Sequence, residues 1–371
     1  MPGLFDTVRL GGFALANRIV MAPMTRSRAD AQGVINASAA RYYAARAGAG
    51  LIVSEGVNVD PASNAFDRAP GLWTRAQVEG WRPVVDAVHA AGGLIVAQLW
   101  HGGRASARGL LGGREPLSPS GVNDDLEALQ VWGLLANGAY VRIAATHSRA
   151  MTPDEIAATV EAYRVAAAHA REAGFDGVEI HGANGYLIPQ FLSPTINRRT
   201  DAYGGDARGR ARFLKEIVAA VTDAVPASRV GLRLSPFATY NDVRDPDPAE
   251  TYGHLASWLA GAGLAYLHLA DTNAWTGAPD YDRMLALFRP HAGPLIVNGG
   301  LTPERAAAIV ADGEAEAVAF GRPFLANPDL PARIRAGGPY NSPRSIGVYG
   351  GGEAGYTDYP ALDAEAANSS R

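Results

Sequence analysis

Eight short apolar runs, separated by longer segments of helical character, constrain the fold of this chain more than any other feature. They lie at residues 18–21, 51–57, 94–99, 177–181, 229–234, 264–269, 295–298 and 317–320. Strands that are almost continuously apolar and alternate with amphipathic helices are typical of a parallel sheet covered by helices. Eight such units predict an α/β fold, a closed (β/α)8 TIM barrel. A doubly wound sheet would need a glycine-rich phosphate loop after the first strand, where this chain has Ala-Pro-Met-Thr.

Turn and capping residues predict further elements around this repeat. Residues 4–15 hold two short apolar pieces around a Gly-Gly pair, which predicts an N-terminal β-hairpin. The long connection 102–151 after the third strand predicts a lid or subdomain over the barrel mouth. Because no linker is visible, we expect residues 1–371 to form one domain. A capping residue followed by proline predicts helix starts at 152–153, 247–248, 302–303 and 327–328.

Composition excludes several functional classes. The 371 residues are 47% hydrophobic and 19% charged, with a formal net charge of −4, which argues against nucleic acid or an anionic membrane as the partner. The absence of cysteine excludes disulfides, thiolate metal sites and cysteine nucleophiles. No leader-like segment and no membrane-spanning stretch is evident. We therefore expect a cytoplasmic protein, a monomer or homodimer, that acts on a small molecule.

The end of the fourth strand presents three polar side chains. Gly182 and Gly185 interrupt the apolar run there, so that His181, Asn184 and Tyr186 fall within six residues. Two N–H donors held close together suit a carbonyl or nitro oxygen on which negative charge builds. A phenol just beyond them can protonate the neighbouring carbon. Taken singly, a histidine at a strand end is more often a structural residue whose hydrogen bonds are already made within the protein. A lone tyrosine more often packs against other side chains.

The ends of other strands suggest a bound phosphorylated ring. Glycines such as Gly300 and Gly321 let backbone N–H groups approach an anion, and Arg322 can add a bidentate charge, in the loops that usually bind phosphate in a barrel. Arg233 lies in an apolar strand, and a buried cation requires an anionic partner. The amide of Gln98 can donate to and accept from a heterocycle edge. Spacing alone does not name the ring, and such glycine pairs are also common as simple turns.

Seven longer stretches match one family in combination and in order. They are A-P-M-T-R at 22–26, Y-Y-A-A-R-A-G-A-G-L-I-V-S-E-G at 42–56, Q-L-W-H-G-G-R at 98–104, H-G-A-N-G-Y-L-I-P-Q-F-L-S-P at 181–194, N-R-R-T-D-A-Y-G-G at 197–205, A-F-G-R-P-F-L-A-N-P-D-L at 319–330 and Y-G-G-G-E-A-G-Y-T-D-Y-P at 349–360. In these motifs the chain resembles the Old Yellow Enzyme family of flavin-dependent ene-reductases. Thr25 and the His-Asn pair are similar to its classical branch.

The resemblance implies a non-covalent FMN, reduced by NADPH or NADH, and reduction of activated C=C bonds in α,β-unsaturated carbonyl and nitro compounds. His181 and Asn184 would bind the activating oxygen, and Tyr186 would donate the proton. FMN-binding residues are then expected at Pro23, Met24, Thr25, Gly56, Gln98, Arg233, Asn298, Gly299, Gly300, Gly321 and Arg322. Substrate contacts are expected at Phe66, Trp100, His181, Asn184, Tyr186, Trp275 and Tyr349.

A metal-dependent hydrolase on the same barrel is the main alternative, with His101 and His181 as ligands. It is disfavoured because the first strand lacks a paired-histidine ending and the chain offers no tight cluster of histidines with carboxylates. No metal is therefore expected. Flavin enzymes with an iron–sulfur domain are excluded in their usual form by the absence of cysteine.

Overall fold

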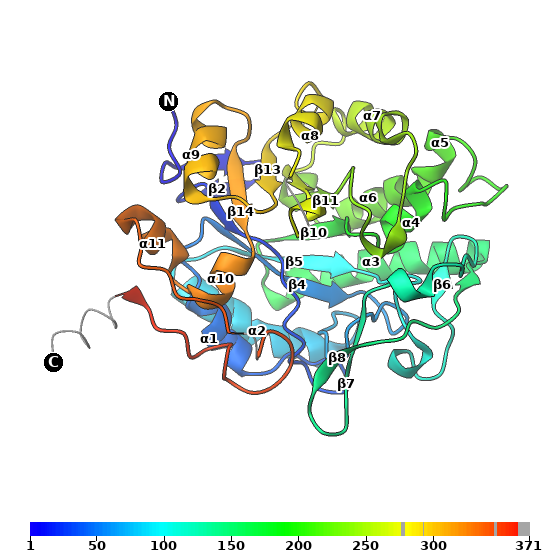
Figure 1. The fold of residues 1–371 in the computed structure, drawn as a ribbon, viewed down its shortest axis with the longest axis horizontal. Coiled ribbons are helices and arrows are strands. Elements are labelled where there is room, and N and C mark those ends of the chain that lie inside the picture. Colours follow the sequence, from blue (N-terminus) through cyan, green and yellow to red (C-terminus); the bar gives the residue numbers. More distant parts are fainter. Residues whose placement is uncertain (276–278, 292, 345–346, 363–371) are drawn as a thin grey trace.

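The chain folds into a closed barrel of parallel strands surrounded by helices (Figure 1). The structure is a computed structural model that describes residues 1–275, 279–291, 293–344 and 347–362. Neighbouring strands follow the order β10-β11-β12-β13-β14-β3-β4-β5. Each predicted run contains or overlaps one barrel strand, so the TIM-barrel prediction is confirmed. These strands are β3 (Ile19–Met21), β4 (Leu51–Asn58), β5 (Ile95–Trp100), β10 (Gly177–Gly182), β11 (Val230–Leu234), β12 (Tyr266–Ala270), β13 (Leu295–Asn298) and β14 (Ala317–Phe320).

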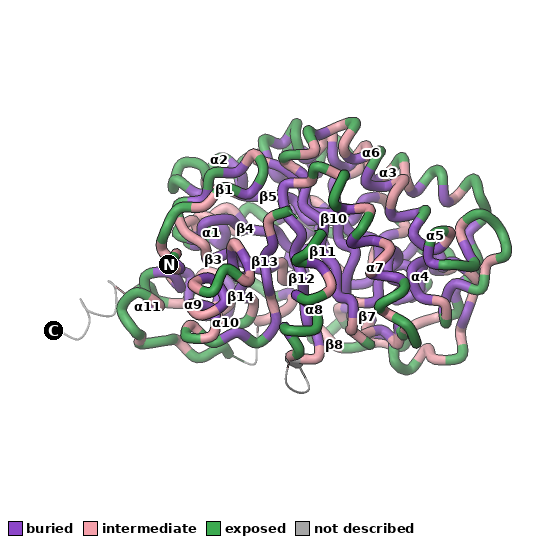
Figure 2. The backbone as a smooth tube through the Cα atoms, turned by 90° about the horizontal axis from the view of Figure 1, so that it is seen from above, coloured by how far each residue is buried: buried purple, intermediate pink, exposed green. Residues whose placement is uncertain are grey.

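Helices cover the outside of the barrel, and the longer ones pack on it through an apolar face. In α3 (Pro153–Ala173) the side chains of Ile156, Tyr163, Ala167 and Ala170 are buried, and Val160 on the same face is partly buried. Figure 2 shows the exposed turns around the buried strands. No helix in the described part of the chain is long and apolar enough to cross a bilayer. The other α-helices there are α1 (Ser38–Ala44), α2 (Arg75–Ala90), α4 (Leu187–Leu192), α5 (Ala207–Arg210), α6 (Arg212–Ala224), α7 (Pro248–Leu259), α8 (Tyr281–Phe288), α9 (Pro303–Ala311), α10 (Arg322–Ala326) and α11 (Leu330–Ala336).

Most of the predicted helix starts are confirmed, and one is wrong. In the confirmed cases proline stands in the first helical turn, and the side chain before it accepts a backbone N–H bond from the third following residue. These capping residues are Thr152, Asp247 and Thr302. The predicted start at 327–328 is wrong, because α11 begins at Leu330 and Asn327 instead follows the end of α10. The side-chain oxygen of Asn327 accepts from Asn341 N (2.7 Å), so it does not cap a helix.

The predicted N-terminal hairpin closes the end of the barrel at which the strands begin. Its strands β1 (Val8–Leu10) and β2 (Phe13–Leu15) pair antiparallel. Leu10, Phe13 and Leu15 pack with residues inside the barrel and form an apolar cluster with them. Gly12 N donates to Ser228 O (2.7 Å), just before β11. Because this end is filled, the open mouth lies at the C-terminal ends of the strands.

The long connection 102–151 folds into short elements beside that mouth. Its β7–β8 hairpin, at the bottom of Figure 1, bridges to the barrel through Phe66 and Trp132. The buried guanidinium of Arg104 binds both carboxylate oxygens of Asp125 and donates to Asn241 O (3.2 Å), so the segment is bonded to the barrel. Its elements are η1 (Arg108–Leu110), β6 (Leu117–Ser118), η2 (Leu126–Ala128), β7 (Val131–Leu134), β8 (Tyr140–Ile143) and β9 (Arg149–Ala150).

Phe13→Ala is expected to lower the free energy of unfolding by about 3–5 kcal/mol, because it removes a buried ring and leaves a cavity inside the barrel. Phe13 is 1% exposed, and the guanidinium of Arg229 lies 5.2 Å from its ring centre. Urea unfolding followed by circular dichroism measures the change. Tyr340→Ala removes a ring that is 46% exposed and serves as the control. Equal losses in the two variants would contradict the role of the hairpin in closing the barrel.

Candidate active site

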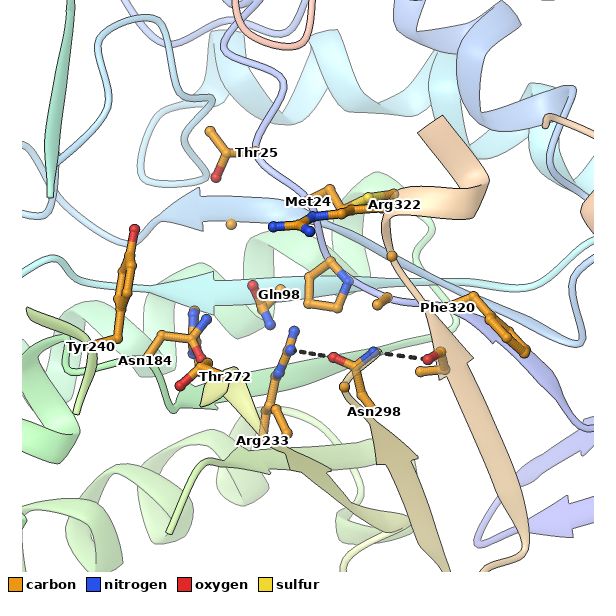
Figure 3. A pocket seen from close by; sticks show the side chains of 18 of the residues that line it. Met24, Thr25, Gln98, Asn184, Arg233, Tyr240, Thr272, Asn298, Phe320 and Arg322 are labelled. Carbon is orange, nitrogen blue, oxygen red and sulfur yellow. Dashed lines mark hydrogen bonds between the residues drawn. The ribbon is translucent and has the colours of Figure 1, made fainter. Parts of the chain in front are cut away.

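A cavity of about 370 Å³ opens at the C-terminal ends of the barrel strands, which is in the usual size range of small-molecule and cofactor sites. Figure 3 shows side chains from several strands around it. Trp275, one of the predicted contacts, ends the 3-10 turn Thr272–Trp275, and its side chain lies outside the described residues. All other predicted site residues line the cavity: Pro23, Met24, Thr25, Gly56, Phe66, Gln98, Trp100, His181, Asn184, Tyr186, Arg233, Asn298, Gly299, Gly300, Gly321, Arg322 and Tyr349.

The cavity also includes residues that sequence reasoning missed. Tyr240 and Thr272 line it from the loops that follow β11 and β12. Asp271 precedes Thr272, and its carboxylate accepts from Asn273 N (2.8 Å) and Asp280 N (2.7 Å), which organises the second loop. Their position in the sequence could have identified them, because both loops follow strand ends that face the barrel mouth.

His181 lies near the end of β10 as an uncharged hydrogen-bond donor. Its Nδ1 accepts from Ala183 N (3.2 Å), so the neutral ring carries its proton on Nε2. Burial lowers the pKa of His181 well below its ordinary value, and the positive charge of Arg233 lowers it further. The imidazole therefore offers an N–H group at neutral pH without carrying a charge.

The turn after β10 holds Asn184 in a left-handed backbone conformation. The φ angles of Asn184 and Gly185 are +59° and +69°, in a region that asparagine tolerates and glycine favours. Asn184 N donates to Ser235 Oγ (2.8 Å), and Asn184 O accepts from Asn241 Nδ2 (3.0 Å). A Cβ at Gly185 would lie 2.0 Å from Tyr240 O, which explains the glycine. The backbone is thus fixed, while Asn184 Oδ1 has no partner among the described residues.

Tyr186 stands between the rings of His181 and Trp100. Its ring centre lies 5.3 Å from that of His181 and 5.0 Å from that of Trp100, both in edge-on geometry. Burial raises the pKa of Tyr186 well above its ordinary value. The phenol therefore keeps its proton at neutral pH and can act as a general acid.

Arg233 and Gln98 are polar side chains inside the barrel at the base of the cavity. Arg233 Nη2 donates to Asn298 Oδ1 (2.8 Å), and Asn298 Nδ2 donates to Ala319 O (2.8 Å), as Figure 3 shows. Gln98 Nε2 donates to Glu179 Oε1 (2.8 Å). Arg233 Nε is buried and has no partner in the described part of the chain. Because an unpaired buried donor is costly, this position suits an acceptor on a bound ring.

Glycines and a guanidinium meet after β13 and β14. Gly299 and Gly300 have φ angles of +140° and +64°, and a Cβ at Gly299 would lie 2.6 Å from Asp271 O. Gly321 and Arg322 complete this side of the cavity. No carboxylate within the described ranges pairs with Arg322. Closely approachable backbone and an unpaired guanidinium together fit an anionic group such as a phosphate.

Aromatic rings form another wall of the cavity. The ring centre of Phe66 lies 6.0 Å from that of Trp100 and 5.7 Å from that of Tyr349. Trp132 of the β7–β8 hairpin stacks on Phe66 with 13° between the ring planes. The hairpin therefore supports rings that line the cavity. Apolar walls with a few convergent polar groups are typical of a site for a planar organic molecule.

Arg26 forms hydrogen bonds with the backbone on both sides of Tyr349, whose ring belongs to this aromatic wall. Its Nε donates to Val348 O (3.0 Å) and its Nη2 to Gly347 O (3.2 Å). The carbonyl oxygen of Arg26 accepts from Gly350 N (2.9 Å). The backbone on both sides of Tyr349 is thus bonded to the residue that follows Thr25 in the chain.

The histidines proposed for the metal-dependent alternative are not arranged as ligands. His101 Nδ1 accepts from Gly103 N (3.0 Å), and its Nε2 lies 3.8 Å from Asp60 Oδ1. His181 belongs to the cavity, whereas His101 is not among the cavity-lining residues. Within the described ranges no three histidines or acidic residues are grouped so that they could hold a metal ion.

Comparison with known proteins agrees with this geometry. The profile of the NADH:flavin oxidoreductase / NADH oxidase family matches residues 3–341. A flavin oxidoreductase of Emericella nidulans is 40% identical, over 96% of this chain and 97% of that protein. A probable flavin mononucleotide-dependent alkene reductase of Leishmania infantum is also 40% identical, over 95% of this chain and 96% of that protein.

Solved structures give the same assignment. Morphinone reductase matches with a TM-score of 0.94 and 43% identity, over 98% of this chain and 97% of that one. The Old Yellow Enzyme homologue from Zymomonas mobilis matches with a TM-score of 0.90 and 39% identity, over 97% of this chain and 100% of that one. The resemblance seen in the sequence motifs is therefore confirmed, and the metal-dependent hydrolase is set aside. The chain belongs to the NADH:flavin oxidoreductase / NADH oxidase family and is an FMN-dependent oxidoreductase.

Proposed function

We propose that this oxidoreductase reduces activated C=C bonds of α,β-unsaturated carbonyl and nitro compounds, with NADPH or NADH as the hydride donor. The observation that carries the proposal is that the neutral His181, the side chain of Asn184 and the protonated Tyr186 line the same cavity as Gln98 and Arg233. The naming of one relative as an alkene reductase and of another as a 12-oxophytodienoate reductase supports the same class of reaction.

The groups at the base of the cavity fit FMN. The unpaired Arg233 Nε suits the pyrimidine part of the flavin, where negative charge gathers on reduction. Gln98 suits the hydrogen-bonding edge of that ring. Bound FMN supplies the redox chemistry, by accepting hydride from the nicotinamide and passing it to the alkene. Arg322 with Gly299, Gly300 and Gly321 is proposed to hold the phosphate, and the remaining contacts are assigned to Pro23, Met24, Thr25, Gly56 and Asn298.

His181 and Asn184 are proposed to bind the activating oxygen of the substrate. The two N–H donors stabilise that oxygen more strongly as it gains negative charge, so they draw electron density away from the β-carbon that receives the hydride. Tyr186 then donates its phenolic proton to the α-carbon. Burial, which keeps His181 neutral and Tyr186 protonated, prepares both groups for these roles.

The other assignments concern substrate contacts and organisation. We propose that Phe66, Trp100 and Tyr349 pack on the substrate and that Trp275 extends this wall. We also propose one FMN-binding barrel domain over 1–371, with 102–151 as its lid. In this proposal the enzyme works in the cytoplasm as a monomer or homodimer, without a nucleic-acid or membrane partner.

Tyr186→Phe tests the proposed function and the proton donor together. In stopped-flow experiments without oxygen, NADPH should reduce the bound flavin and cyclohexenone should then reoxidise it. The variant should be reoxidised at least about 100-fold more slowly, because the general acid is lost, while its reduction by NADPH changes little. Tyr163→Phe, which removes a buried hydroxyl outside the cavity, is the control.

Two results would count against these assignments. Equal losses in both half-reactions of Tyr186→Phe would remove the acid role of Tyr186. If no enone or nitroalkene reoxidises the reduced wild-type enzyme, the proposed function itself is wrong.

The rate of reoxidation by cyclohexenone is expected to be nearly independent of pH between about 6.5 and 8. Burial lowers the pKa of His181 and raises that of Tyr186, so neither group changes its protonation state in this range. The enone itself does not titrate there, so the profile reports on the enzyme and its bound flavin. A transition centred near the ordinary histidine pKa would contradict a neutral His181.

Phenol serves as a test ligand for the proposed oxygen-binding groups His181 and Asn184. Asn241→Asp is expected to weaken its binding roughly tenfold, a loss of about 1.4 kcal/mol of binding free energy. Aspartate keeps the oxygen that accepts from Gln130 N (2.7 Å) but loses the donor to Asn184 O. The left-handed turn that presents the Asn184 side chain would then lose a bond. Titration of the charge-transfer band between phenol and bound flavin measures the effect. Asn137→Asp, on the exposed turn of the β7–β8 hairpin, is the matched control, and equal affinities in both variants would exclude a role for Asn241.

A further inference from the structure

Glu179 is a fully buried acid that the proposed reaction does not use. It lies on β10 two residues before His181, so its side chain points into the barrel, beneath the cavity. Its Oε1 accepts from Gln98 Nε2 (2.8 Å), and its Oε2 accepts from Tyr266 OH (3.2 Å) and lies 2.9 Å from His268 Nδ1. Gln98 is the only one of these partners that lines the cavity. One carboxylate thus connects the interior of the barrel to the base of the site.

The surroundings of Glu179 favour its ionised form. Burial alone would raise its pKa, but the interaction with His268, the nearby charge of Arg233 and the hydrogen bond from Gln98 hold the pKa below its ordinary value. His268 Nδ1 lies 2.9 Å from Glu179 Oε2 and donates to it. Glu179 is the one carboxylate among the described groups that act on the charge of Arg233. A negative charge on Glu179 therefore opposes the positive charge on Arg233 inside the barrel.

Glu179 also decides which way the Gln98 amide faces. A carboxylate only accepts hydrogen bonds, so it can bind Gln98 through Nε2 and not through the carbonyl oxygen. An amide turned by 180° would place its oxygen against the carboxylate, which buried like charges make costly. Gln98 Oε1 is therefore held away from Glu179 and remains available to a donor on a ring bound in the cavity.

We infer that Glu179 is a positioning residue that orients Gln98 toward the flavin and offsets the charge of Arg233. It thereby influences both the affinity for FMN and the reduction potential of the bound flavin. The inference rests on the proposed roles of Gln98 and Arg233. The electrostatic part follows from Coulomb's law in a poorly solvated interior, where a negative charge disfavours the reduced flavin, which is the more negative form.

The first experiment replaces the charge with a neutral isostere. Glu179→Gln should shift the midpoint potential of the FMN-loaded enzyme to a more positive value, measured by equilibration with a reference dye. It should also raise the Kd for FMN severalfold, measured by flavin fluorescence on apoprotein. An unchanged potential and an unchanged Kd would overturn the inference.

Two further variants separate the orienting role from a merely structural one. Tyr266→Phe removes a hydrogen bond from the same carboxylate but leaves its charge and its bond to Gln98. It should leave the midpoint potential unchanged. A shift as large as that of Glu179→Gln would indicate that Glu179 has only a structural role and that its charge does not set the potential. Glu179→Asp keeps the charge but shortens the reach to Gln98, so it should weaken FMN binding without moving the potential. If Glu179→Gln does not fold, Glu179→Asp decides the orienting role, and unchanged FMN affinity in that variant overturns it.

A double-mutant cycle with Gln98→Leu tests the route of the effect. If Glu179 acts on FMN affinity through Gln98, then Glu179→Gln should have little further effect on the Kd in the Gln98→Leu background. Fully additive losses would overturn that route. Potential and affinity need only bound flavin and no alkene, so these results stand even if the proposed alkene substrates prove wrong.

Discussion

The structure depends on the constraint that polar groups buried at the mouth of the barrel must have partners. The interior of the barrel holds Glu179, Arg233 and His268, all at most 4% exposed. Each is bonded to a side chain on a neighbouring or facing strand. Three buried atoms without a partner in the described part of the chain, Arg233 Nε, Asn184 Oδ1 and Trp100 Nε1, lie on residues that line the cavity. These three atoms can therefore bond a ligand there.

The turn after β10 applies the same constraint to the backbone. Asn184 and Gly185 occupy a conformation that costs free energy for most residues. It persists because Ser235, Asn241 and Gln190 bond the backbone of the turn from other segments. The placement of the Asn184 side chain thus depends on residues that are not among those lining the cavity.

Much of this arrangement could be predicted from the sequence, because it obeys local rules. Continuous apolar runs determined the strands, and the rule that barrel chemistry lies at strand ends led from those runs to His181, Gln98 and Arg233. Tyr240 and Thr272 were missed because they lie in loops with no periodic pattern. The β7–β8 hairpin was anticipated only as a long connection, since aromatic contacts with residues distant in the chain hold it in place. The helix start predicted at Asn327 was wrong because the sequence pair Asn-Pro does not show that the Asn327 side chain accepts a hydrogen bond from Asn341 N.

The hairpin of β1 and β2 determines from which end of the barrel ligands can reach the cavity. It fills the far end of the barrel with Leu10, Phe13 and Leu15, so ligands do not reach the cavity through that end. In the proposed function, the nicotinamide and the alkene would both approach from the C-terminal ends of the strands and would bind in the same cavity one after the other. In the proposed reaction, an excess of either reactant would therefore compete with the other for the enzyme.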